Sequence, residues 1–137
     1  MRTLGLDHGT ERIGVALSDE LGMIAQPIEF IPSHPPAGIW TRLKELQSST
    51  PYELIVIGMP RNMDGSYGPA AEKVRAFIEQ MSEEIDTPVK TWDERLSSAQ
   101  ANRVLVQANV SRKKRKGKVD KMAAAIILQS YLDSIQM

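Results

Sequence analysis

The chain has 137 residues, no cysteine and a formal net charge of zero at pH 7, and 42% of its residues are hydrophobic. These values exclude disulfides, thiolate metal sites and a disordered chain, and they fit a single compact domain over residues 1–137. No secretory pattern opens the sequence and no apolar run could cross a bilayer, so we expect a soluble, cytoplasmic protein.

The N-terminal part of the sequence predicts three antiparallel strands. A mainly apolar stretch over residues 2–7 ends in an acid, and a short glycine-containing link joins it to a second strand over residues 11–18. So short a link predicts a hairpin. A third strand over residues 24–31 contains Pro27. Because proline donates no ladder hydrogen bond, this strand should lie at an edge of the sheet.

From residue 39 onward, helices and strands alternate. Apolar residues at helical spacing predict a helix over residues 39–46. The wholly apolar run 54–57 is typical of a central strand that is covered on both faces. A glycine-rich loop over residues 58–68 then leads to an amphipathic helix over residues 72–85.

The C-terminal part predicts one more strand, over residues 88–93, and two helices. The first helix covers residues 97–108, and a basic loop over residues 112–117 separates it from a final helix over residues 118–135. We expect this final helix to turn five side chains inward. They are Val119, Met122, Ala123, Ile126 and Ile127.

This order of elements predicts an α/β fold. Three antiparallel strands followed by strand–helix alternation call for parallel additions with right-handed crossovers, which give a mixed five-stranded sheet with helices on both faces. The same order of elements is found in the ribonuclease H-like fold, and as a pattern it says nothing specific about function.

The zero net charge hides an uneven distribution of charge. Residues 112–121 hold seven bases and one acid, a net charge of +6, so the rest of the chain carries −6. A basic segment on an acidic body is suited to bind a polyanion such as a nucleic acid. A solvated surface segment is the other interpretation. The basic residues we expect to contact substrate are Arg112, Lys113, Lys114, Arg115, Lys116 and Lys118.

Acidic residues fall at the ends of three predicted elements. Asp7 ends the first strand, Asp93 and Glu94 end the last one, and Asp120 lies in the first turn of the final helix. If these ends meet, their oxygens form a site for Mg²⁺ or Mn²⁺, the kind of site that supports two-metal phosphodiester hydrolysis. Each acid could equally serve as a cap or strand terminator.

Only one of the two adjacent acids can point toward Asp7, because neighbouring residues of a strand face opposite sides. We choose Glu94 as the metal ligand, and Asp93 stays the alternative. Arg95 beside it is suited to clamp a phosphate, since guanidinium matches phosphate bidentately, although a surface ion pair would explain it equally well.

The loop over residues 58–68 leaves a central strand and precedes a helix N-terminus. Loops in this position bind anions through backbone N–H groups and the helix dipole. We therefore expect Arg61 and Asn62 to contact substrate. The loop lacks the Lys-Ser/Thr of a phosphate-binding P-loop, and an ordinary crossover connection is the alternative.

Four motifs in order along the chain resemble those of the YqgF-type (RuvX-type) family of Holliday-junction-resolvase-like proteins and pre-16S rRNA nucleases. The first is Asp7-His8-Gly9 with Arg12-Ile13-Gly14-Val15-Ala16 and Ser18-Asp19. The second is Gly58-Met59-Pro60 with Asp64-Gly65 and Gly68. The third is Asp93-Glu94-Arg95-Leu96-Ser97-Ser98-Ala99, and the fourth combines Lys118-Val119-Asp120, Ala123-Ala124 and Ile127-Leu128-Gln129.

The resemblance implies a ribonuclease H-like fold and catalytic, metal-binding acids at Asp7, Glu94 and Asp120. It also implies a structured RNA or DNA substrate, with pre-16S rRNA maturation as the activity. The chain departs from junction resolvases of this fold, whose second acid closes the fourth strand, because this sequence has Gly58 there.

Three other functions fit part of the sequence. A Holliday-junction DNA resolvase is one alternative, although the missing acid at the end of the fourth strand means that junction resolution should not be assumed. A non-catalytic binder of nucleic acid or ribosome precursor would need only the basic segment. An ATP-using protein of the actin and sugar-kinase type shares an Asp-x-Gly turn, but such folds need two lobes and 137 residues supply one. The sequence leaves both a monomer and a homodimer open.

Overall fold

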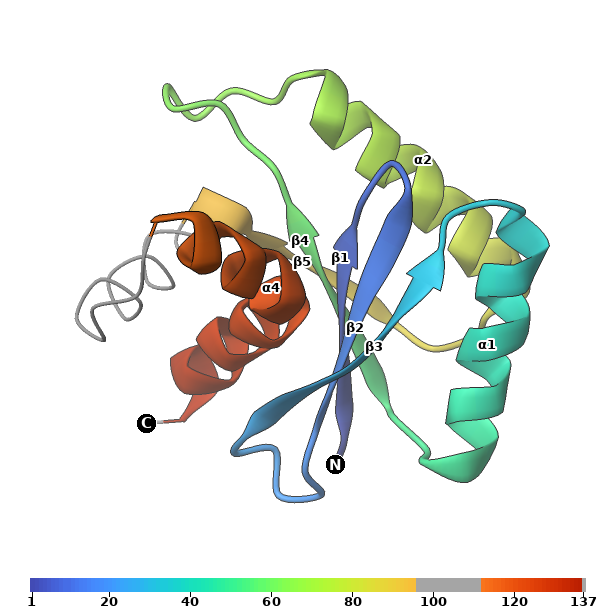
Figure 1. Ribbon diagram of the computed structural model, residues 1–137. Coiled ribbons are helices and arrows are strands. Elements are labelled where there is room, and N and C mark those ends of the chain that lie inside the picture. The colour runs from blue at the N-terminus through green and yellow to red at the C-terminus, as the bar shows by residue number, and fades with distance from the viewer. Residues whose placement is uncertain (96–111, 137) are drawn as a thin grey trace.

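A mixed five-stranded sheet forms the centre of the protein (Figure 1). The structure is a computed structural model that describes the backbone of residues 1–95 and 112–136, and the side chains of residues 1–95 and 122–136. The elements in chain order are β1 (Thr3–His8), β2 (Arg12–Ser18), β3 (Ala25–Pro32), α1 (Pro36–Ser49), β4 (Leu54–Met59), α2 (Pro69–Glu84), β5 (Val89–Asp93) and α4 (Arg112–Ile135).

The strand order in the sheet is β3-β2-β1-β4-β5. The first three strands pair antiparallel, whereas β4 pairs parallel with both β1 and β5. The predicted α/β fold class and sheet are therefore confirmed. Pro27 lies in the edge strand, as predicted, close to a shift in the β2–β3 register between Val15 and Ala16.

Helices cover both faces of the sheet, with α1 and α2 on one face and α4 on the other (Figure 1). Because successive side chains of a strand alternate between faces, Leu4 and Leu6 of β1 pack into the core under α1 and α2. Gly5 and Asp7 therefore face α4. None of the helices in the described part of the chain combines the length and hydrophobicity needed to span a bilayer.

Helix α4 approaches the sheet most closely over Gly5. A Cβ atom at this position would lie 2.8 Å from the Cβ of Leu128 and 3.1 Å from the backbone oxygen of Ala124. Real side chains do not approach so closely, so glycine at this position allows the helix to lie directly on β1. The packing fixes α4 relative to the strand that carries Asp7.

Three expectations about element boundaries need correction. Strand β4 continues through Gly58 and Met59, where the sequence predicted a loop. Residues 112–117 belong to α4 rather than to a loop, because lysine and arginine are good helix formers and no proline interrupts them. The predicted helix over residues 97–108 lies outside the described residues.

The inward face of α4 also differs from the expectation. Met122 is 40% exposed, and Ala123 and Ile126 are only partly buried, while Ile127 is buried as predicted. Several apolar residues along this helix allow two neighbouring stripes, and packing on the sheet decides which of them is buried. The buried side chains are Ala124, Ala125, Ile127, Leu128, Tyr131 and Leu132.

Two glycine substitutions test the packing of α4 on the sheet. We expect Gly5→Ala to lower the free energy of unfolding by about 1–3 kcal/mol, because its methyl group would overlap α4. Gly38→Ala is the matched control: a Cβ there has no atom within 4 Å and lies in helix α1, so its effect should range from neutral to about 1 kcal/mol stabilising. Urea unfolding of both variants measures the difference. Equal effects would contradict the close approach.

Candidate active site

Asp7 and Glu94 lie together at the end of the sheet where β1, β4 and β5 finish. Asp7 is the penultimate residue of β1, and Glu94 follows directly after the last residue of β5. The two side chains are joined by a hydrogen bond, although β4 separates their strands. Two residues 87 positions apart in the sequence thus form one acidic pair.

The environment of this pair favours a proton on Glu94. Burial, the negative charge of Asp7, its hydrogen bond and the negative charge of Asp93 together raise the pKa of Glu94 to about 7. Two neighbouring carboxylates repel each other when both are ionised, so they share a proton or need a cation between them. Near neutral pH the pair is therefore poised to exchange a proton for a positive ion.

The position of Asp120 follows from the path of α4. Ala124 lies close to the end of β1, because a Cβ on Gly14 would be 3.5 Å from both the Cβ of Ala124 and the Cβ of Asp7. Leu128 packs further back along the strand, over Gly5. Position 120 precedes Ala124 by about one helical turn and so continues toward the Asp7 end. The side chain of Asp120 lies outside the described residues, and the described side chains alone contain no cluster of three or more acids, histidines or cysteines.

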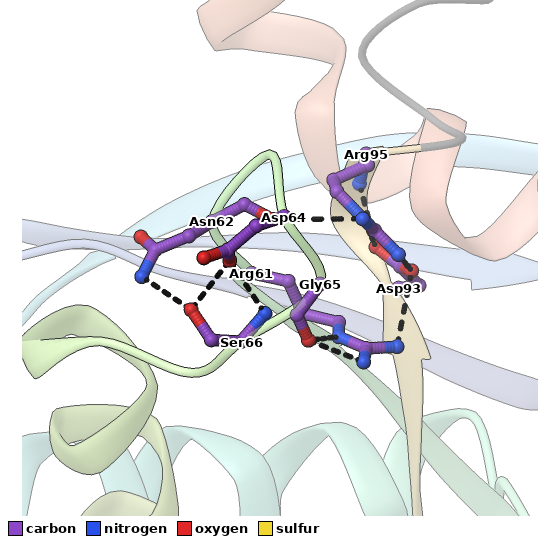
Figure 2. A network of polar contacts seen from close by, with 7 residues as sticks. All are labelled: Arg61, Asn62, Asp64, Gly65, Ser66, Asp93 and Arg95. Atoms are coloured by element: carbon purple, nitrogen blue, oxygen red, sulfur yellow. Dashed lines mark hydrogen bonds and ion pairs between the residues drawn. The ribbon is translucent and has the colours of Figure 1, made fainter.

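Asp93 has different partners from its neighbour Glu94. Its carboxylate accepts hydrogen bonds from the backbone N–H and the guanidinium of Arg95, and it pairs with Arg61 at 3.6 Å (Figure 2). These contacts, the guanidinium of Arg95 first among them, lower the pKa of Asp93. The expected alternation between the adjacent acids is thus present, and of these two acids Glu94 is the one hydrogen-bonded to Asp7.

The loop after β4 is held by its own polar contacts (Figure 2). The guanidinium of Arg61 donates two hydrogen bonds to the backbone oxygen of Gly65, whose φ of +90° suits glycine. Asn62 donates to the hydroxyl of Ser66, and Asp64 accepts from the same residue. The ion pair between Arg61 and Asp93 then fixes the loop to the end of β5.

The expected substrate contacts fall into two groups. Arg61, Asn62 and Arg95 lie in one network, in which Arg95 donates to the backbone oxygen of Asn62. This network adjoins the acidic pair, because Asp93 directly precedes Glu94. The second group lies at the start of α4, where the side chains are outside the described part of the chain. It comprises Arg112, Lys113, Lys114, Arg115, Lys116 and Lys118.

Two residues of this region have roles that differ from those the sequence predicted. Asp93 links Arg61 and Arg95, whereas the sequence offered it as an alternative ligand or a strand terminator, and the ion pair named as the alternative for Arg95 is present. Gly58 was expected in an anion-binding loop, but it belongs to β4 and lies beneath Glu94. Successive residues of β4 alternate between the two faces of the sheet, so Gly58 lies on the same face as Leu54 and Val56, the face covered by α4. This alternation was the signal in the sequence from which the position of Gly58 could have been predicted.

Comparisons with known proteins establish the family. Residues 1–134 match the model of the family described as "RuvX: Holliday junction resolvase". The chain belongs to the RuvX family. A protein of Halothermothrix orenii is 56% identical over 97% of this chain and 95% of its own length, and one of Desulforamulus reducens is 54% identical over 98% of both. Both relatives carry the name "Putative pre-16S rRNA nuclease".

Two solved structures that share this fold are junction resolvases. Thermus thermophilus RuvC in complex with a Holliday junction substrate superimposes with a TM-score of 0.54 at 16% identity, covering 99% of this chain and 97% of that one. The Fowlpox virus resolvase in complex with Holliday junction DNA gives 0.51 at 15% identity over the full length of both chains. These similarities confirm the ribonuclease H-like fold that the order of elements predicted.

The shared proton makes the stability of the metal-free protein depend on pH. The folded pKa of Glu94 lies above its ordinary value of 4.5, so the folded state binds more protons than the unfolded state between pH 4.5 and about 7. The contribution of Glu94 to stability should therefore be full below pH 4.5, fall as the pH rises from 4.5 to about 7, and level off above that. We expect Glu94→Gln to remove this fall and to stabilise the protein at pH 8 by about 2 kcal/mol.

Urea unfolding in a chelator at several pH values between 5 and 8 measures this effect. Asp93→Asn is the comparison, because the charge of Asp93 is the last of the causes that raise the pKa of Glu94, so its removal should reduce this fall in stability only slightly. An unchanged slope of stability against pH in Glu94→Gln would contradict the close pairing of the two acids.

Proposed function

We propose that this RuvX-family protein is a metal-dependent endonuclease that hydrolyses phosphodiester bonds in structured nucleic acid, with the 5′ end of pre-16S rRNA as its substrate. The observation that carries the proposal is the pairing of Asp7 with Glu94 at the end of the sheet. The names of the two relatives, which are more than half identical to this chain, supply the substrate. The work of such an enzyme on ribosome precursors would take place in the cytoplasm.

The acidic pair fits a hard divalent cation. Both groups offer carboxylate oxygens, and the repulsion that favours a proton on Glu94 would be relieved by a bound positive charge. Asp7, Glu94 and Asp120 would hold Mg²⁺ or Mn²⁺, with Asp120 supplied by the turn of α4 that precedes Ala124. When bound, such ions activate water and neutralise the leaving oxygen of a phosphodiester.

The protein's own residues would place the substrate. Arg95 and Arg61 lie beside the acids, and both are paired with Asp93. A phosphate entering this edge could take the place of Asp93 on either guanidinium, since the two oxyanions have similar geometry. The basic turns at the start of α4 would hold the backbone further away, which adds affinity without selecting a sequence.

A second candidate function is cleavage of a four-way DNA junction. The family description and the fold shared with two resolvases favour it. Both substrates require the same chemistry at the acids, so the alternatives differ in the nucleic acid that is bound. The protein could act on either as a monomer or as a homodimer.

Replacement of Asp7 tests the chemistry. We expect Asp7→Asn to lower cleavage by more than the ~10–100-fold that loss of a group around a metal ligand causes. Binding of the nucleic acid in a chelator should stay nearly unchanged, since Asp7 carries no positive charge. Labelled pre-16S RNA and a four-way DNA junction, each with Mg²⁺, Mn²⁺ or chelator, separate the two substrates.

Asp93→Asn is the matched control for this experiment. It removes a carboxylate next to Glu94 but not from the Asp7 pair, so it should retain metal-dependent cleavage far better than Asp7→Asn. Full cleavage by Asp7→Asn would contradict the role of Asp7 in the chemistry. Binding without cleavage by the wild-type protein under every metal condition would refute the nuclease proposal and leave a non-catalytic binder of nucleic acid as the function.

Removal of the basic charges tests how substrate is held. A variant with Lys113, Lys114, Arg115 and Lys116 replaced by Gln should bind nucleic acid more weakly at every sequence, because fewer counterions are released. The slope of log affinity against log salt should become shallower by about 1 for each phosphate group that the variant no longer binds. An unchanged slope would show that these residues do not contact the backbone.

A further inference from the structure

Gly58 lies between the two acids of the candidate site. The sheet order places β4 between β1 and β5, so the side chain of Glu94 must pass over β4 to reach Asp7. The last paired residues of β1 and β4 are Leu6 and Ile57, and Gly58 is the next residue of β4, level with Asp7. On its other side Gly58 pairs with Trp92 of β5.

The crossing uses space that any other residue would fill. A Cβ atom at Gly58 would lie 2.6 Å from the Oε1 of Glu94 and 2.7 Å from its Cγ. It would also lie 2.6 Å from the Cδ1 of Ile127 on α4. Atoms of Glu94 therefore occupy the place where a side chain on β4 would begin.

Backbone conformation gives no reason for glycine here. Among the glycines of the described chain, only Gly22 and Gly65 have a positive φ, whereas Gly58 lies in β4 and pairs in parallel with β5. Glycine in the interior of a strand is unfavourable for two reasons. Its backbone loses more conformational entropy on folding than that of other residues, and it has no side chain to pack. The other strand positions on this face, Leu54 and Val56, do pack against the α4 side. What distinguishes position 58 is the space that its missing side chain leaves for Glu94 and for Ile127 of α4.

We propose that Gly58 is a positioning residue, whose missing side chain lets Glu94 cross β4 and meet Asp7. Glu94 directly follows β5, so it reaches Asp7 only if the intervening residue of β4, Gly58, has no side chain. The expected effect of Gly58 on metal binding rests on the proposed function. The effect of Gly58 on the contact between Glu94 and Asp7 does not, and it can be measured without metal or cleavage.

The smallest substitution tests the proposal. In Gly58→Ala the methyl group displaces Glu94 from Asp7, so Mn²⁺ binding by calorimetry, without nucleic acid, should weaken about tenfold or more. Binding of nucleic acid in a chelator should stay unchanged. Gly38→Ala is the control, because a Cβ there has no atom within 4 Å and the residue lies in α1, on the other face of the sheet from α4 (Figure 1). Wild-type Mn²⁺ affinity in folded Gly58→Ala would overturn the proposal.

A second variant separates Glu94 from Ile127. The double change Gly58→Ala with Ile127→Val removes the atom of Ile127 that the methyl group would meet. If the effect arises from crowding against α4, this variant regains Mn²⁺ binding and the proposal is wrong. If it arises from Glu94, the weakened binding persists.

Moving the acid to β4 gives the opposite test. Since a Cβ at position 58 starts beside the carboxylate of Glu94, Gly58→Asp should place a carboxylate near the same point. We expect Gly58→Asp with Glu94→Ala to recover much of the Mn²⁺ affinity that Glu94→Ala alone loses. If the folded double variant recovers no Mn²⁺ affinity, the side chain at position 58 does not occupy the place of the Glu94 carboxylate, and the proposal is contradicted.

Carboxyl-detected NMR of the metal-free protein separates failure of the proposal from failure of the proposed function. In the wild-type background, Glu94→Gln should shift the carboxyl resonance of Asp7, and in the Gly58→Ala background it should not. The same shift in both backgrounds would overturn the positioning role. Absence of the shift in Gly58→Ala together with no Mn²⁺ binding by the wild-type protein would leave the positioning role standing and remove the metal site.

Discussion

The repulsion between two adjacent carboxyl groups is the constraint around which this protein's functional edge is arranged. Asp7 and Glu94 are held together by a regular sheet, although each would be more stable alone in water. Strands β1, β4 and β5 position the pair, and the packing of α4 over Gly5 fixes the helix that carries position 120. A site that is strained by like charge in the metal-free state gains most from binding a cation.

The adjacent residues Asp93 and Glu94 show how one strand end serves two purposes. Asp93 accepts hydrogen bonds from Arg95 and pairs with Arg61, and so it fixes the loop after β4. Glu94 turns the other way and crosses β4. The same alternation separates structural from chemical groups on β1, where Leu6 fills the core and Asp7 faces α4.

Sequence patterns predicted the sheet because its strands and helices depend on local periodicity. The meeting of Asp7 with Glu94 was expected only on the condition that the ends of their strands lie close together, which strand order decides. The edge position of Pro27 and the separate directions of Asp93 and Glu94 follow from backbone hydrogen bonding and from a period of two. The role of Gly58 depends on strand order, since only the placement of β4 between β1 and β5 brings Glu94 over it. The buried stripe of α4 could not be chosen either, because several apolar residues fit two neighbouring faces and packing on the sheet decides between them. The basic start of α4 resembles a loop in the sequence, since charge density alone does not distinguish a loop from a helix.

The most direct measurement is a crystal structure of the protein soaked in Mn²⁺, with the ion located by its anomalous scattering. The account predicts anomalous density in contact with the carboxylate oxygens of both Asp7 and Glu94, with the Glu94 side chain lying across Gly58. Mn²⁺ bound elsewhere, or Asp7 and Glu94 turned apart without an ion between them, would contradict it.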